Sequence, residues 1–267
     1  MTADAPLPRD TRAKRMSAAE SMQRALTTVS AIVSKEQDPP SLVARIASEI
    51  GAEIVEGEHA PGDDLNSVEL SRRYNTSRTP VREALMLLEK EGLVTVPPRR
   101  RPRVNRFDIS DVREIYRTRS SLLEFIAADV ARFASDAEIE ELTRIGERMQ
   151  IAFEHRDANA YLWANVDFHD LNTLLSRNRT VKRIIDSLLL RTLPLRRISL
   201  SRTEWVASSL DDHLYLIKAY RNRDPNLAAA LLRSNHIQAL TRLEVLLPET
   251  GDEASRSDDG LPDFCRQ

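Results

Sequence analysis

The apolar residues in the first third of the chain recur at helical spacing and stop at recognisable turns. The stretch LVARIASEIGAEIV, which follows Ser41, has this spacing, and EGEHAPGDDL after it carries a Pro-Gly turn. Asn66 can cap a short helix over SVELSRRY, and NTS leads into SRTPVREALMLLEKEGLV. One face of this last stretch is apolar and consists of Val81, Ala84, Leu85 and Leu88. These patterns predict three consecutive helices.

A different pattern follows these helices. GLVTV and RPRVNRF are short, strand-like segments on either side of PPRRR, which predicts a two-stranded hairpin with a basic tip. Three helices followed by a hairpin is the order of a winged helix-turn-helix domain.

Beyond the hairpin the signals are helical throughout and glycine is scarce. Ser110 can cap a long helix, and Ser135 with Glu138 three residues later has the pattern of a capping box. Asp224-Pro225 supplies a cap and a first-turn proline for the last helix. The expected fold is therefore mainly α: a winged helix-turn-helix with a small β-hairpin wing, followed by an all-α helical bundle.

These signals divide the 267 residues into four parts. Residues 1–37 form an N-terminal arm that is partly helical, and residues 38–106 form the winged domain. Residues 107–247 form the helical domain, and residues 248–267, rich in Asp, Ser, Gly and Pro, form a disordered tail.

The composition is typical of a cytoplasmic protein. No apolar run approaches the roughly 18 residues that cross a bilayer, and the N-terminus lacks the apolar core of a signal peptide. The single cysteine, Cys265, excludes an internal disulfide framework and agrees with a reducing compartment. We therefore expect no membrane partner.

A basic region is hidden within the net charge of -2. Residues 78–106 hold eight basic and three acidic side chains, a local charge of +5. Arg78 and Arg82 stand in the first turns of a predicted helix, where the helix dipole disfavours cations. An external anion must therefore compensate them, and DNA phosphate is the anion that recognition helices meet there. A solvated basic face on an ordinary helix is the alternative.

The segments EHAPGDDL, LSRRYNTSRTPVREALMLLEKEGLV and PPRRRPRV, within residues 41–106, resemble the DNA-binding domain of the GntR family of bacterial transcription regulators. The resemblance implies that Arg78 and Arg82 contact bases and phosphates of double-stranded operator DNA. Where the family's wing has an Arg-Gly-Ala run, this chain has Arg100, Arg101 and Pro102, so arginine charge is expected to grip phosphates instead. The full expected set is Arg72, Arg78, Thr79, Arg82, Arg99, Arg100, Arg101 and Arg103.

Three of the five histidines fall in predicted helices of the second domain. His213 and His236 are 23 residues apart on consecutive helices, so a helix pair can bring them side by side. Asn165 lies four residues before His169, on the same helical face. A single helical histidine is more often a hydrogen-bonded core or surface residue than a metal ligand.

NVDFHDLNTLLSRN and DDHLYLIKAYRNRDPNLAAALLRSNHIQAL are similar to the effector-binding FCD domain of the FadR subfamily of GntR regulators, over about residues 107–247. Many such domains hold a divalent metal, zinc or nickel, through one Asp and three His, and a carboxylate effector completes the coordination. The resemblance places the ligands at Asn165, His169, His213 and His236. Asn165 stands at the Asp position, and its neutral oxygen attracts a cation less than a carboxylate does. Asp167 is a poor substitute because it points about 200° round the helix from His169.

An arginine is the expected partner of an effector carboxylate. The candidates are Arg119, Arg191 and Arg196. Each of them is also compatible with a position on the surface.

The favoured function is a ligand-responsive transcription regulator, a repressor that binds palindromic operator DNA as a homodimer. A small organic acid, alone or metal-bound, is expected to change its DNA affinity. A metal-dependent hydrolase or lyase with a basic appendage is the alternative, but it needs a general base near the metal and the sequence has no HExxH pair. A constitutive architectural DNA binder would leave the histidines unexplained.

Overall fold

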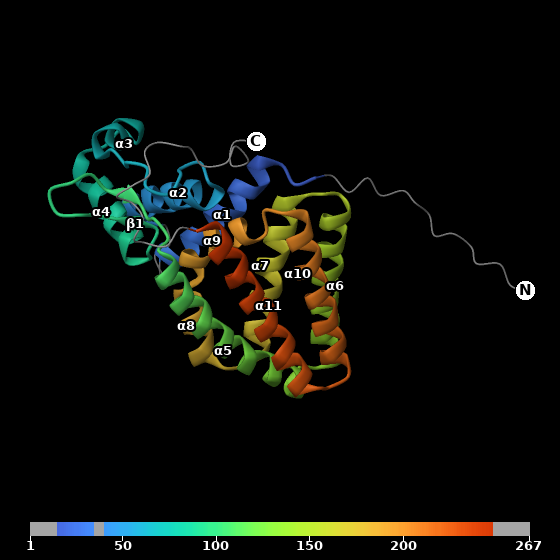
Figure 1. Ribbon diagram of the computed structural model, residues 1–267. Coiled ribbons are helices and arrows are strands. Elements are labelled where there is room, and N and C mark those ends of the chain that lie inside the picture. Colours follow the sequence, from blue (N-terminus) through green and yellow to red (C-terminus); the bar gives the residue numbers. More distant parts are fainter. Residues whose placement is uncertain (1–14, 35–39, 248–267) are drawn as a thin grey trace, which may run out of the picture.

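The computed structural model describes residues 15–34 and 40–247 of the chain (Figure 1). The predicted disordered tail lies outside the described residues. The amino-terminal part contains α1 (Ala18–Val33), α2 (Leu42–Glu56), α3 (Ser67–Arg73), α4 (Arg78–Lys90), β1 (Val94–Thr95) and β2 (Arg103–Val104). The helical domain contains α5 (Ile109–Phe133), α6 (Asp136–Glu154), α7 (Ala158–Leu175), α8 (Arg179–Ser187), α9 (Leu189–Ser199), α10 (Thr203–Arg221) and α11 (Pro225–Leu246).

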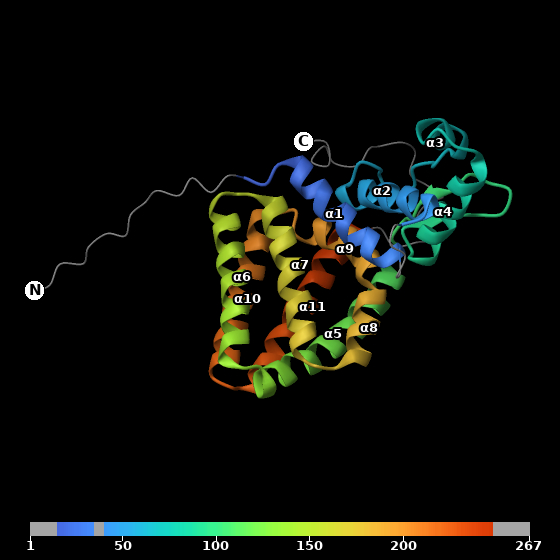
Figure 2. The ribbon, with the colours of Figure 1, turned by 180° about the vertical axis from the view of Figure 1, so that it is seen from behind.

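The winged helix-turn-helix is present as the sequence predicts. Asn66 caps α3 by accepting a hydrogen bond from the Val68 amide. β1 and β2 pair antiparallel, with Val94 opposite Val104. The predicted apolar face of α4, consisting of Val81, Ala84, Leu85 and Leu88, is fully buried. In both views α3 and α4 project at the end of the molecule away from α6 and α10 (Figures 1 and 2).

α1 packs against the winged domain. A capping box between Ser17 and Glu20 starts it, and its Val29 side chain lies over Gly51 of α2. A Cβ at Gly51 would stand 2.8 Å from Cγ1 of Val29 and 3.1 Å from Cδ2 of Leu88. The missing side chain therefore lets α1, α2 and α4 meet closely.

The winged domain and the helical domain share one apolar core. Trp163 and Val166 of α7 and Leu190 and Leu193 of α9 belong to the same buried cluster as α1, α2 and α4. Trp163 Nε1 also donates a hydrogen bond of 2.9 Å to Oγ of Ser21 on α1. Because apolar burial is favourable in proportion to area, this continuous core ties the two domains together.

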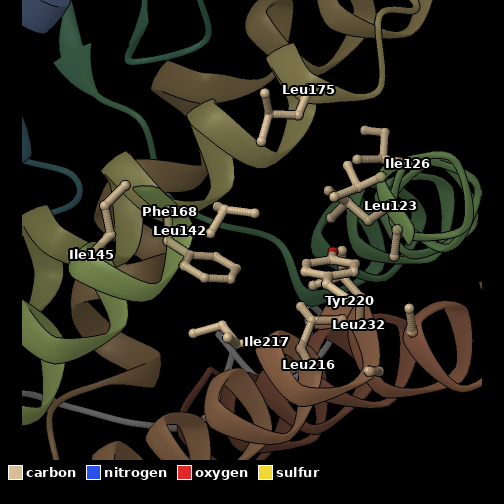
Figure 3. Close-up of a cluster of buried hydrophobic side chains, with 14 of the residues drawn as sticks. Leu123, Ile126, Leu142, Ile145, Phe168, Leu175, Leu216, Ile217, Tyr220 and Leu232 are labelled. Atoms are coloured by element: carbon tan, nitrogen blue, oxygen red, sulfur yellow. The ribbon is translucent and has the colours of Figure 1, made fainter. Parts of the chain in front are cut away.

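The helical domain packs around a second core of its own (Figure 3). α5 runs along α11, and α6 packs on α7 and α10. The predicted capping box of Ser135 and Glu138 and the cap at Asp224 are both present. Within the described parts of the chain, no helix has the length and apolarity needed to cross a membrane.

Two helix boundaries differ from the prediction. Asp108, not Ser110, caps α5, because its carboxylate accepts the Ser110 amide two residues on. The sequence analysis placed no boundary within RTVKRIIDSLLLRTL, but the structure divides this stretch at Leu188 into α8 and α9. The division turns α9 toward the winged domain, where Leu190 and Leu193 are buried.

Candidate functional site

Glu53 of α2 fixes the position of α3. It accepts hydrogen bonds from both terminal nitrogens of Arg73, and its Oε2 lies 3.1 Å from Nε2 of His59. Burial disfavours the ionised carboxylate, but the bonds from His59 and Arg73 outweigh burial and lower the pKa of Glu53 to about 2. The same bond raises the pKa of His59. The helix-turn-helix is thus held by charge-assisted bonds as well as by its core.

The amino end of α4 is open. Ser77 occupies the cap position, but its side chain makes no cap hydrogen bond to the first amides of the helix. Arg78, Thr79 and Arg82 are all exposed beside this end. Backbone amides and guanidinium groups together form a site suited to phosphate.

The basic side chains of this face divide into two sets. Arg101 and Arg103 pair with Asp64, at 3.8 and 2.7 Å between nitrogen and oxygen. Five exposed arginines on this face form no ion pair with another described residue: Arg72, Arg78, Arg82, Arg99 and Arg100. The turn of the helix-turn-helix and the tip of the wing therefore carry uncompensated positive charge.

The wing turns without the family's glycine. The amide of Arg100 donates to the carbonyl of Pro97, 3.2 Å away, and closes a turn through Pro98 and Arg99. Arg99 has φ of 59°, the left-handed conformation that the third residue of a type II turn requires. An arginine there costs roughly 1 kcal/mol relative to glycine.

Five helices of the second domain bring six polar side chains together in its interior. We call this set the histidine–arginine cluster, and all of its members are buried. α5 supplies Arg119, α7 supplies Asn165 and His169, α9 supplies Arg196, α10 supplies His213, and α11 supplies His236.

A chain of hydrogen bonds runs through the histidine–arginine cluster. Arg196 Nη1 donates to Oδ1 of Asn165 at 3.2 Å, and Nδ2 of Asn165 lies 3.3 Å from Nε2 of His213. Nδ1 of His213 lies 2.6 Å from the carbonyl of Ser209. Nε2 of His169 is also 3.3 Å from Nε2 of His213, and the rings of His169 and His236 stand 5.1 Å apart at 90°.

Arg119 is the exception in this cluster because its charge has no partner. Its side chain is 1% exposed, and within the described part of the chain neither Nη1 nor Nη2 has a hydrogen-bond partner. Burial, and then the charge of Arg196, lower the pKa of Arg119 to about 9, so it remains a cation at neutral pH. Buried donors are normally satisfied, so this pair of nitrogens requires an explanation.

The three histidines of the cluster are neutral. Burial, followed by the nearby charge of Arg196, lowers the pKa of His169 well below its usual value. The pKa of His236 is lowered in the same way by burial and then Arg119. The pKa of His213 falls to about 4, chiefly because of burial. The net charge of the cluster at neutral pH therefore comes from its two arginines.

Two parts of the chain match models of known protein families. Residues 42–104 match the family model for bacterial regulatory proteins of the gntR family, and residues 114–239 match the FCD domain. The HTH-type transcriptional regulator BphR of Paraburkholderia xenovorans is 30% identical over 206 residues, which span 74% of this chain and 83% of BphR.

The chain belongs to the GntR family.

This GntR regulator has further relatives of the same kind. The gluconate operon transcriptional repressor of Bacillus licheniformis is 26% identical over 209 residues, 76% of this chain and 85% of the repressor. The solved structure of E. coli McbR/YncC shares the fold, with a TM-score of 0.64 and 22% identity over 77% of this chain and 98% of that one. The chain is therefore a transcription regulator with an FCD effector-binding domain, and the alternative of a hydrolase or lyase is excluded.

The histidine–arginine cluster differs from the metal site that the resemblance implies. FCD domains often bind metal, yet among the described residues no group of three or more His, Cys, Asp or Glu is placed to hold a metal ion. The cluster contains no carboxylate, and Arg196 already engages the oxygen of Asn165. The positive charges of Arg119 and Arg196 would also repel a bound cation.

Two residues named by the sequence analysis lie elsewhere. Arg191 is exposed and its side chain packs over Gly92, just beyond α4, so it does not join Arg119 and Arg196. Asp167 pairs at the surface with Arg24 and Arg148, which agrees with its rejection as a ligand.

Three contributors were missed by the sequence analysis. Ser209 lies four residues before His213, a spacing that could have suggested their contact. Glu53 and Arg197 carried no local signal, because their partners lie in other elements. Arg197 joins α9 to α2: its guanidinium donates to Val55, to Glu56 and, on α7, to Asn159.

Proposed function

We propose that this GntR regulator represses transcription by binding a palindromic operator as a homodimer, with one α4 helix in the major groove of each half-site. We further propose that a small organic acid, bound at the histidine–arginine cluster, changes its DNA affinity. The observation that carries the first part is the open amino end of α4 with Arg78 and Arg82 unpaired beside it.

The unpaired arginines lie in two places, at the amino end of α4 and at the wing tip, and this arrangement supports a two-point contact with DNA. Arg78 and Arg82 stand where a recognition helix reaches base edges and phosphates. Arg99 and Arg100, at the wing tip, are then available to the adjacent backbone or minor groove. Asp64 restrains the arginines at the base of the wing, which orients the tip.

The partnerless Arg119 supports an acidic effector. An unpaired charge inside a protein costs several kcal/mol, which a bound anion offsets. A carboxylate fits the two parallel N–H donors of a guanidinium. The relative from Bacillus licheniformis is named for the operon of gluconate, which is itself an organic acid.

Helix α9 can transmit binding to the DNA-binding domain. Arg196 belongs to the histidine–arginine cluster, while its neighbour Arg197 holds the carboxyl end of α2. Leu190 and Leu193 of the same helix lie in the shared core. An anion that attracts Arg196 would therefore shift α9 and, through it, α2. DNA affinity changes only as far as the effector binds the two arrangements differently.

A second form of the proposal adds zinc or nickel on Asn165, His169, His213 and His236. The 3.3 Å between Nε2 of His169 and Nε2 of His213 favours it, since two ligands of one metal are about this far apart. Treatment with EDTA separates the two forms, because it removes the effector response only in the metal-bound form.

The test begins with the operator. The full chain is used to select binding sites from random duplex DNA, and affinity is then measured by fluorescence anisotropy for a complete site and for a single half-site. The proposal predicts an inverted repeat, a dimer by sedimentation and much weaker binding to one half-site. A direct repeat, or a monomer that binds half-sites equally well, would remove the dimer part.

The effector is tested on the selected operator. Gluconate, lactate, malate and citrate are added separately, and both anisotropy and thermal stability are followed. At least one acid should raise the melting temperature and change the DNA affinity. If no acid in a wider panel does either, the effector part fails, whereas DNA binding stands.

A further inference from the structure

We infer that the histidine–arginine cluster binds the carboxylate of its effector directly, without a metal ion, and that the guanidinium group of Arg196 takes the place of the metal. This inference rests on the proposed function only for the existence of an acidic effector. It otherwise rests on the contacts that surround the side chain of Asn165.

The oxygen of Asn165 is already committed. Arg196 Nη1 donates to Oδ1 at 3.2 Å, and both residues are buried. A metal that used this oxygen would have to displace Arg196 or stand beside it. Two cations so close together in a medium of low dielectric repel strongly, so the site as built selects against a second cation.

The contacts of His213 are accounted for without a metal. A backbone carbonyl only accepts, so the 2.6 Å contact with Ser209 places the proton of His213 on Nδ1. Nε2 of His213 is then an acceptor, and it faces two donors at 3.3 Å: Nδ2 of Asn165 and Nε2–H of His169. The short distance between the two histidines is thus explained by a hydrogen bond.

What the cluster lacks is negative charge. Arg119 and Arg196 carry guanidinium groups, which stay protonated in proteins. Among the described residues, the buried nitrogens of the cluster without a hydrogen-bond partner are both Nη atoms of Arg119 and the Nδ1 atoms of His169 and His236. Each of the two arginines disfavours the other, and Arg196 contributes to the lowered pKa of Arg119. A carboxylate that binds both arginines would accept from the free donors of Arg119 and neutralise one of the two positive charges. A metal ion would neither accept hydrogen bonds from the donors of Arg119 nor reduce the positive charge of the cluster.

The first arm of the test measures metal in the full chain. Protein stripped with EDTA is incubated with equimolar zinc or nickel and desalted, and the metal retained is measured by mass spectrometry. We expect far less than one ion per chain. The double variant Asn165→Asp with Arg196→Met restores the family's carboxylate and removes the guanidinium, and should retain about one ion.

The second arm measures carboxylate binding. Calorimetric titration with the acid that gives the largest thermal shift is carried out in EDTA and again in zinc. The affinity should be the same in both. Arg119→Met should weaken it roughly tenfold to 100-fold, since a charge-assisted bond is lost. Arg191→Met, an exposed arginine on the same helix as Arg196, is the matched control and should have no effect.

The outcomes separate the inference from the proposed function. Stoichiometric metal in the wild-type chain, with carboxylate binding lost in EDTA, would overturn the inference while leaving the effector in place. Equal affinity with and without zinc supports it, even if the double variant does not fold. If no acid binds with or without zinc, the effector proposal fails and the inference fails with it, whatever metal the wild-type chain retains.

Discussion

The arginines at the amino end of α4 and those inside the helical domain are alike in lacking carboxylate partners, but they differ in exposure. Arg78 and Arg82 stand in solvent, where an unpaired charge costs little. Arg119 is 1% exposed and Arg196 is 7% exposed, so their charges are expensive to keep. Both regions are therefore suited to anions. They differ in the free energy that the unpaired charge costs the protein when no anion is bound.

The difference in exposure also determines which kind of anion each region is suited to bind. Exposed arginines spread over α4 and the wing tip match a long polyanion and should be screened strongly by salt. Two buried arginines within one interior site match a single small anion and should respond little to salt. We therefore propose that the same residue type serves two purposes here and that its burial determines which.

The largest expected effect is the loss of operator binding in Arg82→Ala. The contact to a base or phosphate is lost, and affinity for the selected operator should fall by about 100-fold or more. Because Arg82 is exposed and unpaired, the melting temperature should not change. Fluorescence anisotropy measures the operator affinity, and thermal unfolding measures the melting temperature. Arg45→Ala, an exposed arginine on α2, is the control; equal losses in both variants would refute the assignment to α4.

Arg119→Met should have the opposite effect on stability. It replaces a buried, partnerless cation with an apolar side chain and should stabilise the effector-free chain by about 1–4 kcal/mol. Urea unfolding in buffer without carboxylates measures this. A destabilised variant would show that Arg119 has a structural partner and would break the comparison.

Glu53→Gln tests the part of the DNA-binding domain that is held by ion pairs. The pKa of Glu53 is about 2 in the folded chain and near 4.5 otherwise, so its contribution is complete above pH 4.5 and is lost as pH falls from 4.5 toward 2. The pKa of His59 is raised above 6.5, so its contribution is present below pH 6.5 and is lost as pH rises through the higher folded value.

The variant should lose roughly 2 kcal/mol at pH 6. Unfolding curves from pH 3 to 8 should show a smaller decline toward acid pH in the variant than in the wild type. Parallel curves for the two proteins would mean that Glu53 does not carry this pH dependence.

Arg99→Gly has the smallest expected effect. Glycine relieves the left-handed strain at the wing tip and should stabilise the fold by up to about 1 kcal/mol. It also removes one cation, so the salt dependence of DNA binding should weaken by about one phosphate contact. A change in operator sequence preference would show instead that Arg99 contacts bases.

Local sequence signals predicted the elements well. Asn66, the Ser135–Glu138 pair and Asp224 act through their own neighbours, so their caps were found. The apolar periodicity of α4 likewise predicted which of its residues are buried. Asp108 was missed as a cap because the side chain of Ser110, two residues on, can also accept a hydrogen bond from the first amides of a helix.

The candidate sites were predictable only in part. The spacing of His213 and His236 suggested that they meet, and both lie in the cluster. Nothing local distinguished Arg119, which is buried, from Arg191, which lies over Gly92, because burial depends on packing between distant helices. The division at Leu188, which sends α9 to the winged domain, is likewise a tertiary effect.

The central claim is that exposed, unpaired arginines at α4 and the wing exist to bind the DNA backbone. The measurement that tests it most directly is the affinity of the full chain for operator DNA across a series of potassium chloride concentrations. The logarithm of affinity should fall linearly with the logarithm of salt, with a slope of about −0.9 for each phosphate neutralised. An affinity that does not change with salt, or no affinity for duplex DNA at all, would contradict the account.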